Sequence, residues 1–198
     1  FFINIQFYAV FVVAMTQIDK DTDLKLPETD ELTFRVIQTG DSAFVKDYLA
    51  DAETTKYLPF ERPYSEEQAN EWLNLRLNHW KNHGFGTFIV REKGQVEPIG
   101  YCGLEYSKGT DFIDIRYGLI PKVWGRGYAY KAALAVLTYG FTTLNMNKIC
   151  GAAVPENVPS IAVLEKLGLK PDAAFDVYGD VVHPYSMNQE EFLKRFQL

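Results

Sequence analysis

The sequence predicts a mixed α+β domain, and three observations lead to this prediction. Several short segments are rich in β-branched and aromatic residues and are bounded by turn residues, as strands are. Four longer stretches indicate helices, three by apolar residues at helical spacing and one by its capping residues. The chain has 198 residues, which is enough for one domain of ordinary size. A domain of this length buries about 70% of the surface that its unfolded chain exposes, so it needs neither disulfides nor a metal to hold together.

The first half of the domain is expected to contribute a strand, two helices and a hairpin. Ser65 and Gln68 form the capping-box pattern of a helix start, and Gly84 provides the stop. Lys93 and Gly94 mark the hairpin turn. The expected elements are a strand over residues 32–38, helices over 41–50 and 65–84, and strands over 88–92 and 98–106.

The second half is expected to begin with a strand that Pro121 ends. A helix follows the glycine-rich turn at Gly125 and Gly127, with apolar residues at i, i+3 and i+4 over three turns. The expected elements are strands over 112–120 and 148–154, helices over 127–141 and 157–168, strands over 174–178 and 181–187, and a terminal amphipathic turn holding Phe192 and Phe196.

Charge and composition exclude some classes of protein. The 20 Lys and Arg against 26 Asp and Glu give a net charge of −6, and no Lys/Arg run occurs, so a nucleic-acid binder is not expected. Cys102 and Cys150 lie in apolar, strand-like segments and are expected to be buried, reduced thiols of a cytoplasmic protein. His79 and His83 are four residues apart, but no third metal ligand accompanies them. We expect a solvated helix end there and no metal.

The first residues form a separate segment. Residues 1–14, FFINIQFYAVFVVA, are strongly apolar but shorter than the roughly 20 residues that a membrane-spanning helix needs. No positive charge precedes them, as a signal peptide would require. We expect an apolar extension that is not a targeting element, with a membrane anchor as the minor alternative. Residues 15–31 form a charged linker, and residues 32–198 form the domain.

The glycine-rich turn is a candidate anion site. The run WGRGYA, residues 124–129, joins a strand to a helix. Backbone N–H groups and the helix dipole favour an anion at such a junction, glycines permit close approach, and Arg126 adds charge. A tight turn with no ligand remains the alternative. The run is neither a dinucleotide-binding fingerprint, because the GxGxxG spacing is missing, nor a P-loop, because no Gly-Lys-Ser/Thr follows.

A second motif changes the interpretation. Residues 157–168, NVPSIAVLEKLG, read by themselves as a capped helix that ends at Gly168. Together the two motifs resemble those of the GNAT superfamily of acetyl-CoA-dependent N-acetyltransferases. The RimJ/RimL type, which acetylates ribosomal-protein N-termini, is the most similar branch, because it has Trp where this chain has Trp124. The strand DIRYGL, residues 114–119, matches that branch with Asp114 for the common Glu and Arg116 for a common Gly.

The resemblance implies a fold and a coenzyme site. The fold would be a mixed, mostly antiparallel sheet of six to seven strands, flanked by about four helices and splayed at strands four and five. Pantetheine would pair with the backbone near Leu119 and Ile120, as an added strand does. The pyrophosphate would sit on the turn, and Asn157 would reach the pantetheine arm. The implied acetyl-CoA contacts are Leu119, Ile120, Trp124, Gly125, Arg126, Gly127, Tyr128, Ala129, Asn157 and Ser160.

Catalysis would be a direct attack of a neutral primary amine on the thioester. Asp114 is the first candidate base and Glu105 the second, because the amine must lose a proton. Ser160 is the candidate acid for the leaving thiolate, and Tyr185 competes for that role. Three of the four also have a structural alternative: a surface strand residue or one ion-paired with Arg116 for Asp114, a plain first-turn serine for Ser160, and a core tyrosine for Tyr185.

The acceptor is expected to be a small-molecule amine or a protein N-terminus. Aromatic residues that wall its site, unless they are core residues, are Tyr57, Phe60, Tyr64 and Trp72. No nucleic-acid or membrane partner is expected, and the chain would be a monomer or homodimer. Three rival interpretations remain: a non-catalytic acyl-CoA-binding module, a nucleotide-binding α/β domain, and an interaction protein that uses its apolar N-terminus.

Overall fold

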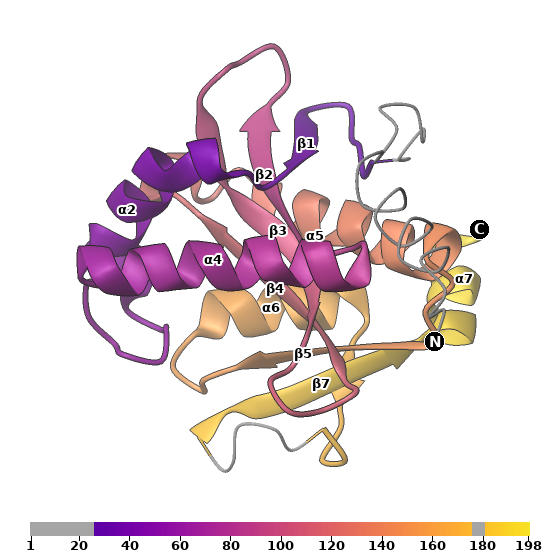
Figure 1. The fold of residues 1–198 in the computed structure, drawn as a ribbon. Helices are drawn as coiled ribbons and strands as arrows, with labels where there is room; N and C mark the ends of the chain where they lie inside the picture. Colours follow the sequence, from indigo (N-terminus) through magenta and orange to yellow (C-terminus); the bar gives the residue numbers. More distant parts are fainter. Residues whose placement is uncertain (1–25, 176–180) are drawn as a thin grey trace, which may run out of the picture.

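The computed structural model describes residues 26–175 and 181–198, in which a seven-stranded sheet forms the centre (Figure 1). The strand order is β1-β2-β3-β4-β5-β7-β6. All neighbouring strands are antiparallel except β4 and β5, which are parallel. The strands are β1 (Leu32–Val36), β2 (Thr87–Glu92), β3 (Pro98–Tyr106), β4 (Ile113–Leu119), β5 (Lys148–Ala153), β6 (Lys170–Pro171) and β7 (His183–Asn188).

The four predicted helices are present, and two further helices accompany them in the described part of the chain. The terminal amphipathic turn is a full helix, which Asn188 caps through its side chain. A π-helical stretch over Tyr139–Thr143 continues α5. The helices are α2 (Ser42–Ala50), α3 (Ala52–Thr55), α4 (Glu66–His83), α5 (Tyr128–Thr138), α6 (Val158–Leu167) and α7 (Gln189–Phe196).

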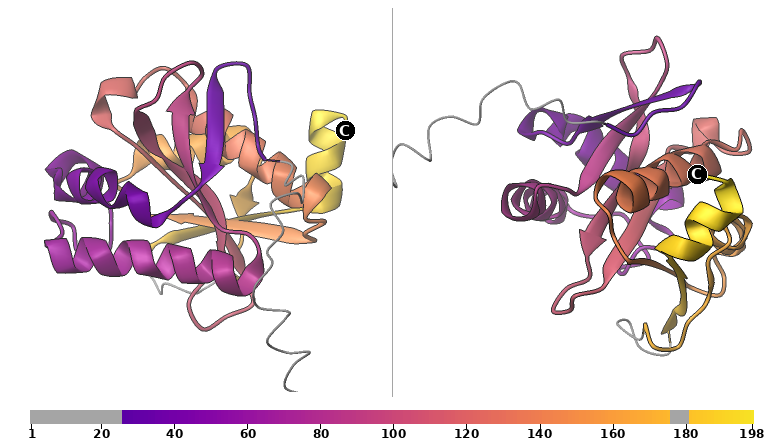
Figure 2. Two further views of the ribbon diagram at one scale, coloured as in Figure 1. Left: turned by 45° about the horizontal axis from the view of Figure 1, so that its top comes forward. Right: turned by 90° about the vertical axis from the view of Figure 1, so that its right-hand side faces the viewer.

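Helices cover both faces of the sheet (Figure 2). On one side, which we call the α4 face, Tyr101 of β3 packs against Trp72 of α4 with ring centroids 5.0 Å apart. On the other side, the α6 face, a Cβ on Gly151 of β5 would lie 2.9 Å from Leu164 of α6 and 3.2 Å from Ile115 of β4. Because side chains alternate along a strand, each residue of β3 and β4 can be assigned to one of these faces.

The sheet is opened at its centre, as the family resemblance implied. β3 and β4 are joined from Gly100↔Leu119 to Tyr106↔Ile113, whereas β4 and β5 share the one register pair Asp114↔Cys150. In the described residues, the part of β4 that follows Asp114 therefore has no strand partner on the β5 side. This open edge of β4 runs toward Leu119 and the glycine-rich turn.

One predicted strand is wrong in its described part. Ala174 belongs to a turn, and the short β6 precedes it at Lys170–Pro171. Asp172 causes the turn, because its side chain accepts from the Ala174 N–H at 3.1 Å and its carbonyl accepts from the Phe175 N–H at 3.0 Å. The rest of that predicted strand, residues 176–178, lies outside the described residues, as do residues 1–25 of the apolar extension and linker.

The close packing of β2 on β3 gives a test of the fold. A Cβ on Gly103 would lie 2.4 Å from the Thr87 Cα and 2.5 Å from the Gly86 carbonyl oxygen, which are backbone atoms that cannot move aside. Gly103→Ala should therefore lower the free energy of unfolding by about 2 kcal/mol in urea titrations. Gly40→Ala is the control, since nothing lies within 4 Å of its Cβ position. Equal losses in both variants would contradict the register of β2 and β3.

Candidate active site

The glycine-rich turn has the backbone of an anion site. Gly125 and Gly127 adopt φ of 76° and 75°, the left-handed region that favours glycine. Gly127 is the N-cap of α5 and has no side chain with which to cap the helix. Helices α4 and α6, in contrast, are capped by the side chains of Ser65 and Asn157. The first N–H groups of α5 therefore remain available to a ligand, and the helix dipole makes that ligand an anion.

Glu92 at the end of β2 holds the side chains of this turn in place. Its Oε1 accepts from Nη1 of Arg126 at 3.0 Å and from the hydroxyl of Tyr128 at 2.9 Å. The Arg126 side chain is still 48% exposed, so a ligand can reach it. Sequence reasoning missed Glu92, because 34 residues separate it from Arg126 and nothing local marks the contact.

Trp124 connects the turn to the open edge of β4. Its indole N–H donates to the Leu119 carbonyl at 2.7 Å, while the side chain is 49% exposed. The Ile120 N–H donates to the Ile99 carbonyl at 2.9 Å, and the Ile120 carbonyl accepts from the Val123 N–H at 3.2 Å. The Leu119 carbonyl and both backbone groups of Ile120, which the resemblance offers to pantetheine, are thus already engaged. A carbonyl oxygen accepts two hydrogen bonds, so both carbonyls can take a second donor.

The start of α6 lies against the same strand from the α6 face. Asn157 caps the helix, since its side-chain oxygen accepts from the Ser160 N–H at 3.3 Å. The hydroxyl of Tyr117 in β4 lies 2.9 Å from the Ser160 Oγ and donates to the Ser160 carbonyl at 3.1 Å. Sequence reasoning missed Tyr117. The available signal was the alternation of side chains along β4, which puts Tyr117 on the face opposite Asp114. This pair fixes the start of α6 beside the open edge of β4.

The two candidate bases lie together on the α4 face. Glu105 of β3 is the register partner of Asp114 of β4, and each is 5% exposed. Arg116 joins them: its Nη1 donates to Glu105 Oε2 at 3.2 Å, and its Nε donates to Asp114 Oδ2 at 3.3 Å. The sequence pattern predicted the second of these pairs as the structural alternative for Asp114.

Glu105 has two further partners. The Thr87 hydroxyl donates to its Oε1 at 2.6 Å, and the Nε of Arg76 lies 3.7 Å from the same oxygen. Burial favours a raised pKa for Glu105, but the charges of Arg76 and Arg116 outweigh burial and hold the pKa below its ordinary value. A carboxylate held in this way is ionised and accepts a proton only weakly. Arg76 is itself buried and lies over the Trp72 ring, 3.9 Å from its centroid.

Tyr185 and Ser160 lie on the other side of the sheet from the two carboxylates. Tyr185 of β7 is the register partner of Gly151, which faces α6, and it is 5% exposed within the main hydrophobic core. Burial raises the pKa of its hydroxyl. The structure therefore gives Tyr185 the surroundings of a core tyrosine. It brings Glu105 and Asp114 together and separates both from Ser160 by the thickness of the sheet.

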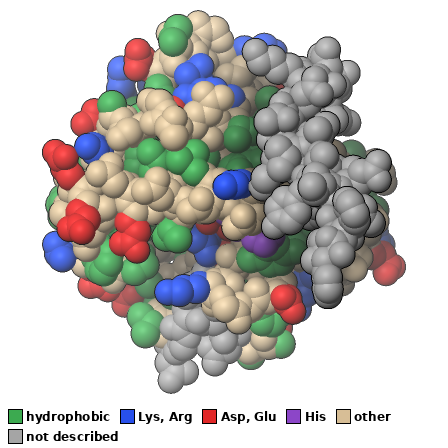
Figure 3. Space-filling view, in the orientation of Figure 1, with side chains coloured by type: hydrophobic (Ala, Val, Ile, Leu, Met, Phe, Trp, Pro, Cys, Tyr) green, Lys and Arg blue, Asp and Glu red, His purple; other side chains and the backbone are tan. Residues whose placement is uncertain are grey.

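The aromatic residues proposed for the acceptor wall divide between core and surface. Trp72 is buried against Tyr101, whereas Phe60 is 49% exposed and its ring packs 5.0 Å from that of Tyr64. Tyr57 is half-buried. A hollow opens below α4 in the space-filling view, with basic side chains and a histidine on its wall (Figure 3). The side chains of Asp114 and Glu105 also lie on this α4 face of the sheet.

The sequence had indicated that His79 is a solvated helix-end residue, and the structure shows that this prediction is wrong. His79 is half-buried, its Nδ1 lies 2.8 Å from the Phe85 carbonyl, and its Nε2 accepts from the Tyr106 N–H at 3.0 Å. Nδ1 therefore carries the proton, and burial lowers the pKa of His79. Both ring nitrogens are occupied, which leaves none to bind a metal. Within the described ranges, no three His, Cys, Asp or Glu side chains gather as a metal site.

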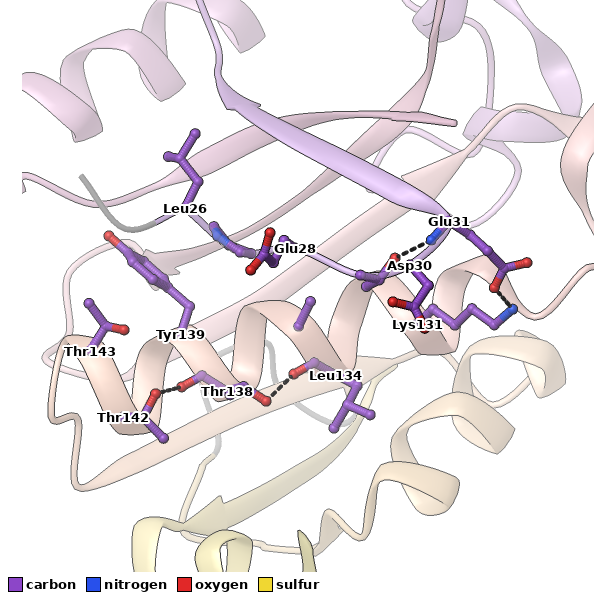
Figure 4. Close-up of a pocket in the computed structure, with 13 residues that line it drawn as sticks. Leu26, Glu28, Asp30, Glu31, Lys131, Leu134, Thr138, Tyr139, Thr142 and Thr143 are labelled. Carbon is purple, nitrogen blue, oxygen red and sulfur yellow. Dashed lines mark hydrogen bonds and ion pairs between the residues drawn. The ribbon is translucent and has the colours of Figure 1, made fainter. Parts of the chain in front are cut away.

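Two other features lie apart from these residues. Cys102 and Cys150 are free and buried, and burial raises the pKa of Cys150 to about 12, so neither is an activated nucleophile. A cavity of about 500 Å³ lies between residues 26–31 and α5, with Glu31 paired to Lys131 at one end and Tyr139 at the other (Figure 4). No predicted site residue lines it. Among the described helices, none combines the length and apolarity needed to cross a membrane.

The buried charges give a pH-dependent prediction. Glu105→Gln leaves Arg76 and Arg116 without a buried counter-charge and should lower the free energy of unfolding by about 3 kcal/mol at pH 7. Because the folded-state pKa of Glu105 lies below its ordinary value of 4.5, the wild-type advantage is full above that pH and disappears as the pH falls through the folded-state pKa. Urea titrations across that range measure it. Exposed Glu97→Gln is the control, and a pH-independent difference for Glu105→Gln would contradict the assignment.

Comparison with known proteins places this geometry in a family. Residues 31–170 match the family described as an acetyltransferase (GNAT) domain. An uncharacterized N-acetyltransferase, p20 of Bacillus licheniformis, is 32% identical over 155 residues, which are 76% of this chain and 85% of that protein. The spermidine N(1)-acetyltransferase of Escherichia coli is 27% identical over 164 residues, which are 82% of each chain.

A solved structure has the same fold. The spermidine N-acetyltransferase from Vibrio cholerae, in complex with CoA and spermine, superposes with a TM-score of 0.68 at 24% identity, covering 83% of this chain and 99% of that one. This similarity shows that the two proteins share a fold. Because the family match also covers more than half of the 198 residues, the chain belongs to the GNAT family of acetyltransferases and is an acyltransferase.

Proposed function

We propose that this enzyme transfers the acetyl group of acetyl-CoA directly to a primary amine. The open edge of β4 is the observation that carries the proposal, because it lies between the uncapped start of α5 and the start of α6. An extended thioester arm fits along such an edge, with its charged end at the turn. The names of the relatives support an amine acceptor, since N-acetylation is what they share.

In this proposal the turn binds the diphosphate of the coenzyme. The N–H groups of residues 125–129 donate to it, and Arg126 contributes its exposed guanidinium. The pantetheine arm runs along β4, where its amide N–H groups donate to the second lone pairs of the Leu119 and Ile120 carbonyls. The Asn157 amide nitrogen donates to the arm from α6. The thioester then lies at the level of Tyr117 and Ser160.

The amine enters from the α4 face, where the carboxylates lie. Only the neutral amine is nucleophilic, so its ammonium proton must first leave. We assign the base to Asp114, acting directly or through water, because the hydrogen bonds from Thr87 and Arg116 and the nearby charge of Arg76 hold the pKa of Glu105 low. A backbone N–H of β4 would stabilise the oxyanion, and Ser160 on the α6 face would give a proton to the departing sulfur. Much of the rate would come from holding amine and thioester together.

The acceptor is a small-molecule amine or a protein N-terminus. Trp124 and residues 157–168 favour the RimJ/RimL type, which acts on protein N-termini. The spermidine N-acetyltransferases among the relatives favour a small polyamine. On the α4 face, Arg76 and Arg116 balance Glu105 and Asp114, so these four side chains do not make a strongly anionic surface that would select a polycation.

Acetyl-CoA binding and turnover test the function together. Calorimetry should show binding, and CoA release should follow with at least one of spermidine, glycinamide and a short peptide with a free N-terminus. Arg126→Ala should weaken acetyl-CoA binding about fivefold at low salt and less at high salt, because the lost contact is exposed and ionic. The matched control is Lys194→Ala, which removes an exposed charge on α7.

Each outcome separates the alternatives. No heat of binding on folded protein would overturn the coenzyme site. Binding without CoA release from any of the three amines would favour the non-catalytic acyl-CoA-binding module. Equal binding by Arg126→Ala and wild type would remove the diphosphate from the turn.

The pH–rate profile tests the base. Asp114→Asn should lower kcat/KM about a hundredfold at neutral pH and move the rising limb of the profile toward the pKa of the free amine, because the amine must then lose its proton to solvent. Asp111→Asn, an exposed residue in the β3–β4 hairpin, is the control and should leave the profile unchanged. An unaltered profile for Asp114→Asn would show that water, rather than this carboxylate, is the base.

A further inference from the structure

We propose that Tyr117 is a positioning residue that aims the hydroxyl of Ser160 at the sulfur of the departing CoA. The proposal rests on the proposed function, because it assigns a role within the acetyl transfer. Its basis is a contact that no local sequence pattern announces: a phenol of the central strand and a first-turn serine of α6, 43 residues apart, with their hydroxyl oxygens 2.9 Å from each other.

Ser160 is not needed to cap its own helix. Serines near a helix start commonly accept from backbone N–H groups. In α6 this work is done by Asn157, whose side chain accepts from the Ser160 N–H at 3.3 Å. The Ser160 Oγ therefore takes no part in the cap, and Tyr117 is its hydrogen-bond partner in the described structure. This removes the main structural explanation for a serine at this position.

The single hydroxyl of Tyr117 lies close to two oxygen atoms of Ser160. This hydroxyl lies within reach of both the Ser160 carbonyl, at 3.1 Å, and the Ser160 Oγ, at 2.9 Å. The phenol has one proton, which either the Ser160 carbonyl or the Ser160 Oγ can accept. In the proposal the Oγ accepts it, so one lone pair of Oγ is occupied and the single serine proton points elsewhere. The open edge of β4 lies beside this pair. The serine proton is thereby directed toward the space that the proposed function gives to the thioester.

The phenol acts as a fixed donor and does not ionise. Burial raises the pKa of the Tyr117 hydroxyl well above its ordinary value, and the bond to Ser160 only partly offsets this effect. Tyr117 therefore keeps its proton throughout the reaction. Its bond to Oγ becomes strongest when Ser160 carries negative charge, because hydrogen bonds to charged oxygens are shorter and stronger. Such a bond lowers the barrier rather than the energy of the bound substrate.

The proton and electron balance of the step closes without another reagent. The amine nitrogen forms the C–N bond, and the C–S bond breaks with its electron pair on sulfur. The Ser160 hydroxyl proton moves to that sulfur, while the Tyr117 hydroxyl stabilises the serine oxygen. The nitrogen releases its excess proton to the base, and solvent returns a proton to Ser160. The products are CoA with a free thiol and the N-acetylated amine.

A double-mutant cycle tests the role of Tyr117. The assay follows CoA release from acetyl-CoA with spermidine, glycinamide and a free N-terminal peptide as acceptors, and calorimetry measures acetyl-CoA binding. Ser160→Ala should lower kcat about a hundredfold, the usual contribution of a general acid. Tyr117→Phe should lower kcat about tenfold, the loss of one hydrogen bond to a charged oxygen, with the acetyl-CoA Kd unchanged. When Ser160→Ala is already in place, Tyr117→Phe should cost less than about a further twofold.

Tyr139→Phe is the matched control. Tyr139 packs in the same hydrophobic core as Tyr117, and its buried hydroxyl has no hydrogen-bond partner within the described residues. Its removal should leave kcat and Kd unchanged. Thermal unfolding of all variants shows whether a loss of activity follows a loss of folded protein.

The outcomes keep the two proposals apart. If wild type binds acetyl-CoA but acetylates none of the three amines, the proposed function fails and the role of Tyr117 fails with it. If wild type is active and Tyr117→Phe retains full kcat, only the positioning role is overturned. Equal losses from Tyr117→Phe with and without the Ser160→Ala substitution would also overturn it, because they would show a structural effect that does not pass through the serine hydroxyl.

Discussion

The single register pair between β4 and β5 is the constraint on which the rest of the structure depends. A strand in the middle of a sheet normally has both edges paired, because unpaired backbone groups inside a protein are costly. Here β4 is paired with β3 along its length and with β5 at Asp114 alone. On its remaining edge the Leu119 carbonyl accepts from the indole of Trp124, and the Tyr117 side chain of the same strand reaches α6. The opening is therefore a built feature of the fold.

The charges on the α4 face follow from the same constraint. Two carboxylates at paired positions of β3 and β4 would repel each other if both were ionised in a buried site. Arg116 lies between them, and Arg76 supplies a second positive charge from α4. The network makes the two acids unequal in their surroundings, because Glu105 also accepts from Thr87. It ties the helix that borders the α4 face to the two central strands.

Much of the fold could be predicted from the sequence, and the site only in outline. The four main helices follow from apolar spacing and from local caps such as Ser65 with Gln68, which act over a few residues. The paired expectations for Asp114 and Arg116 also came from local spacing. Three features were missed because each joins distant segments: Glu92 with Arg126, Tyr117 with Ser160, and His79 with Tyr106. The predicted strand at Ala174 failed because Asp172 turns the chain through its own side chain.

The contact between Glu92 and the glycine-rich turn has a consequence for selectivity. A guanidinium that already faces a carboxylate at 3.0 Å offers an incoming anion less net attraction than a lone arginine does. A small inorganic ion, which touches the turn alone, gains little from such a partly neutralised cation. A long ligand that also lies along β4 would make further hydrogen bonds far from Glu92. The carboxylate would therefore remove a smaller fraction of its binding free energy. Under the proposed function, Glu92 would therefore favour a long ligand that reaches from the turn to the centre of the sheet over free phosphate.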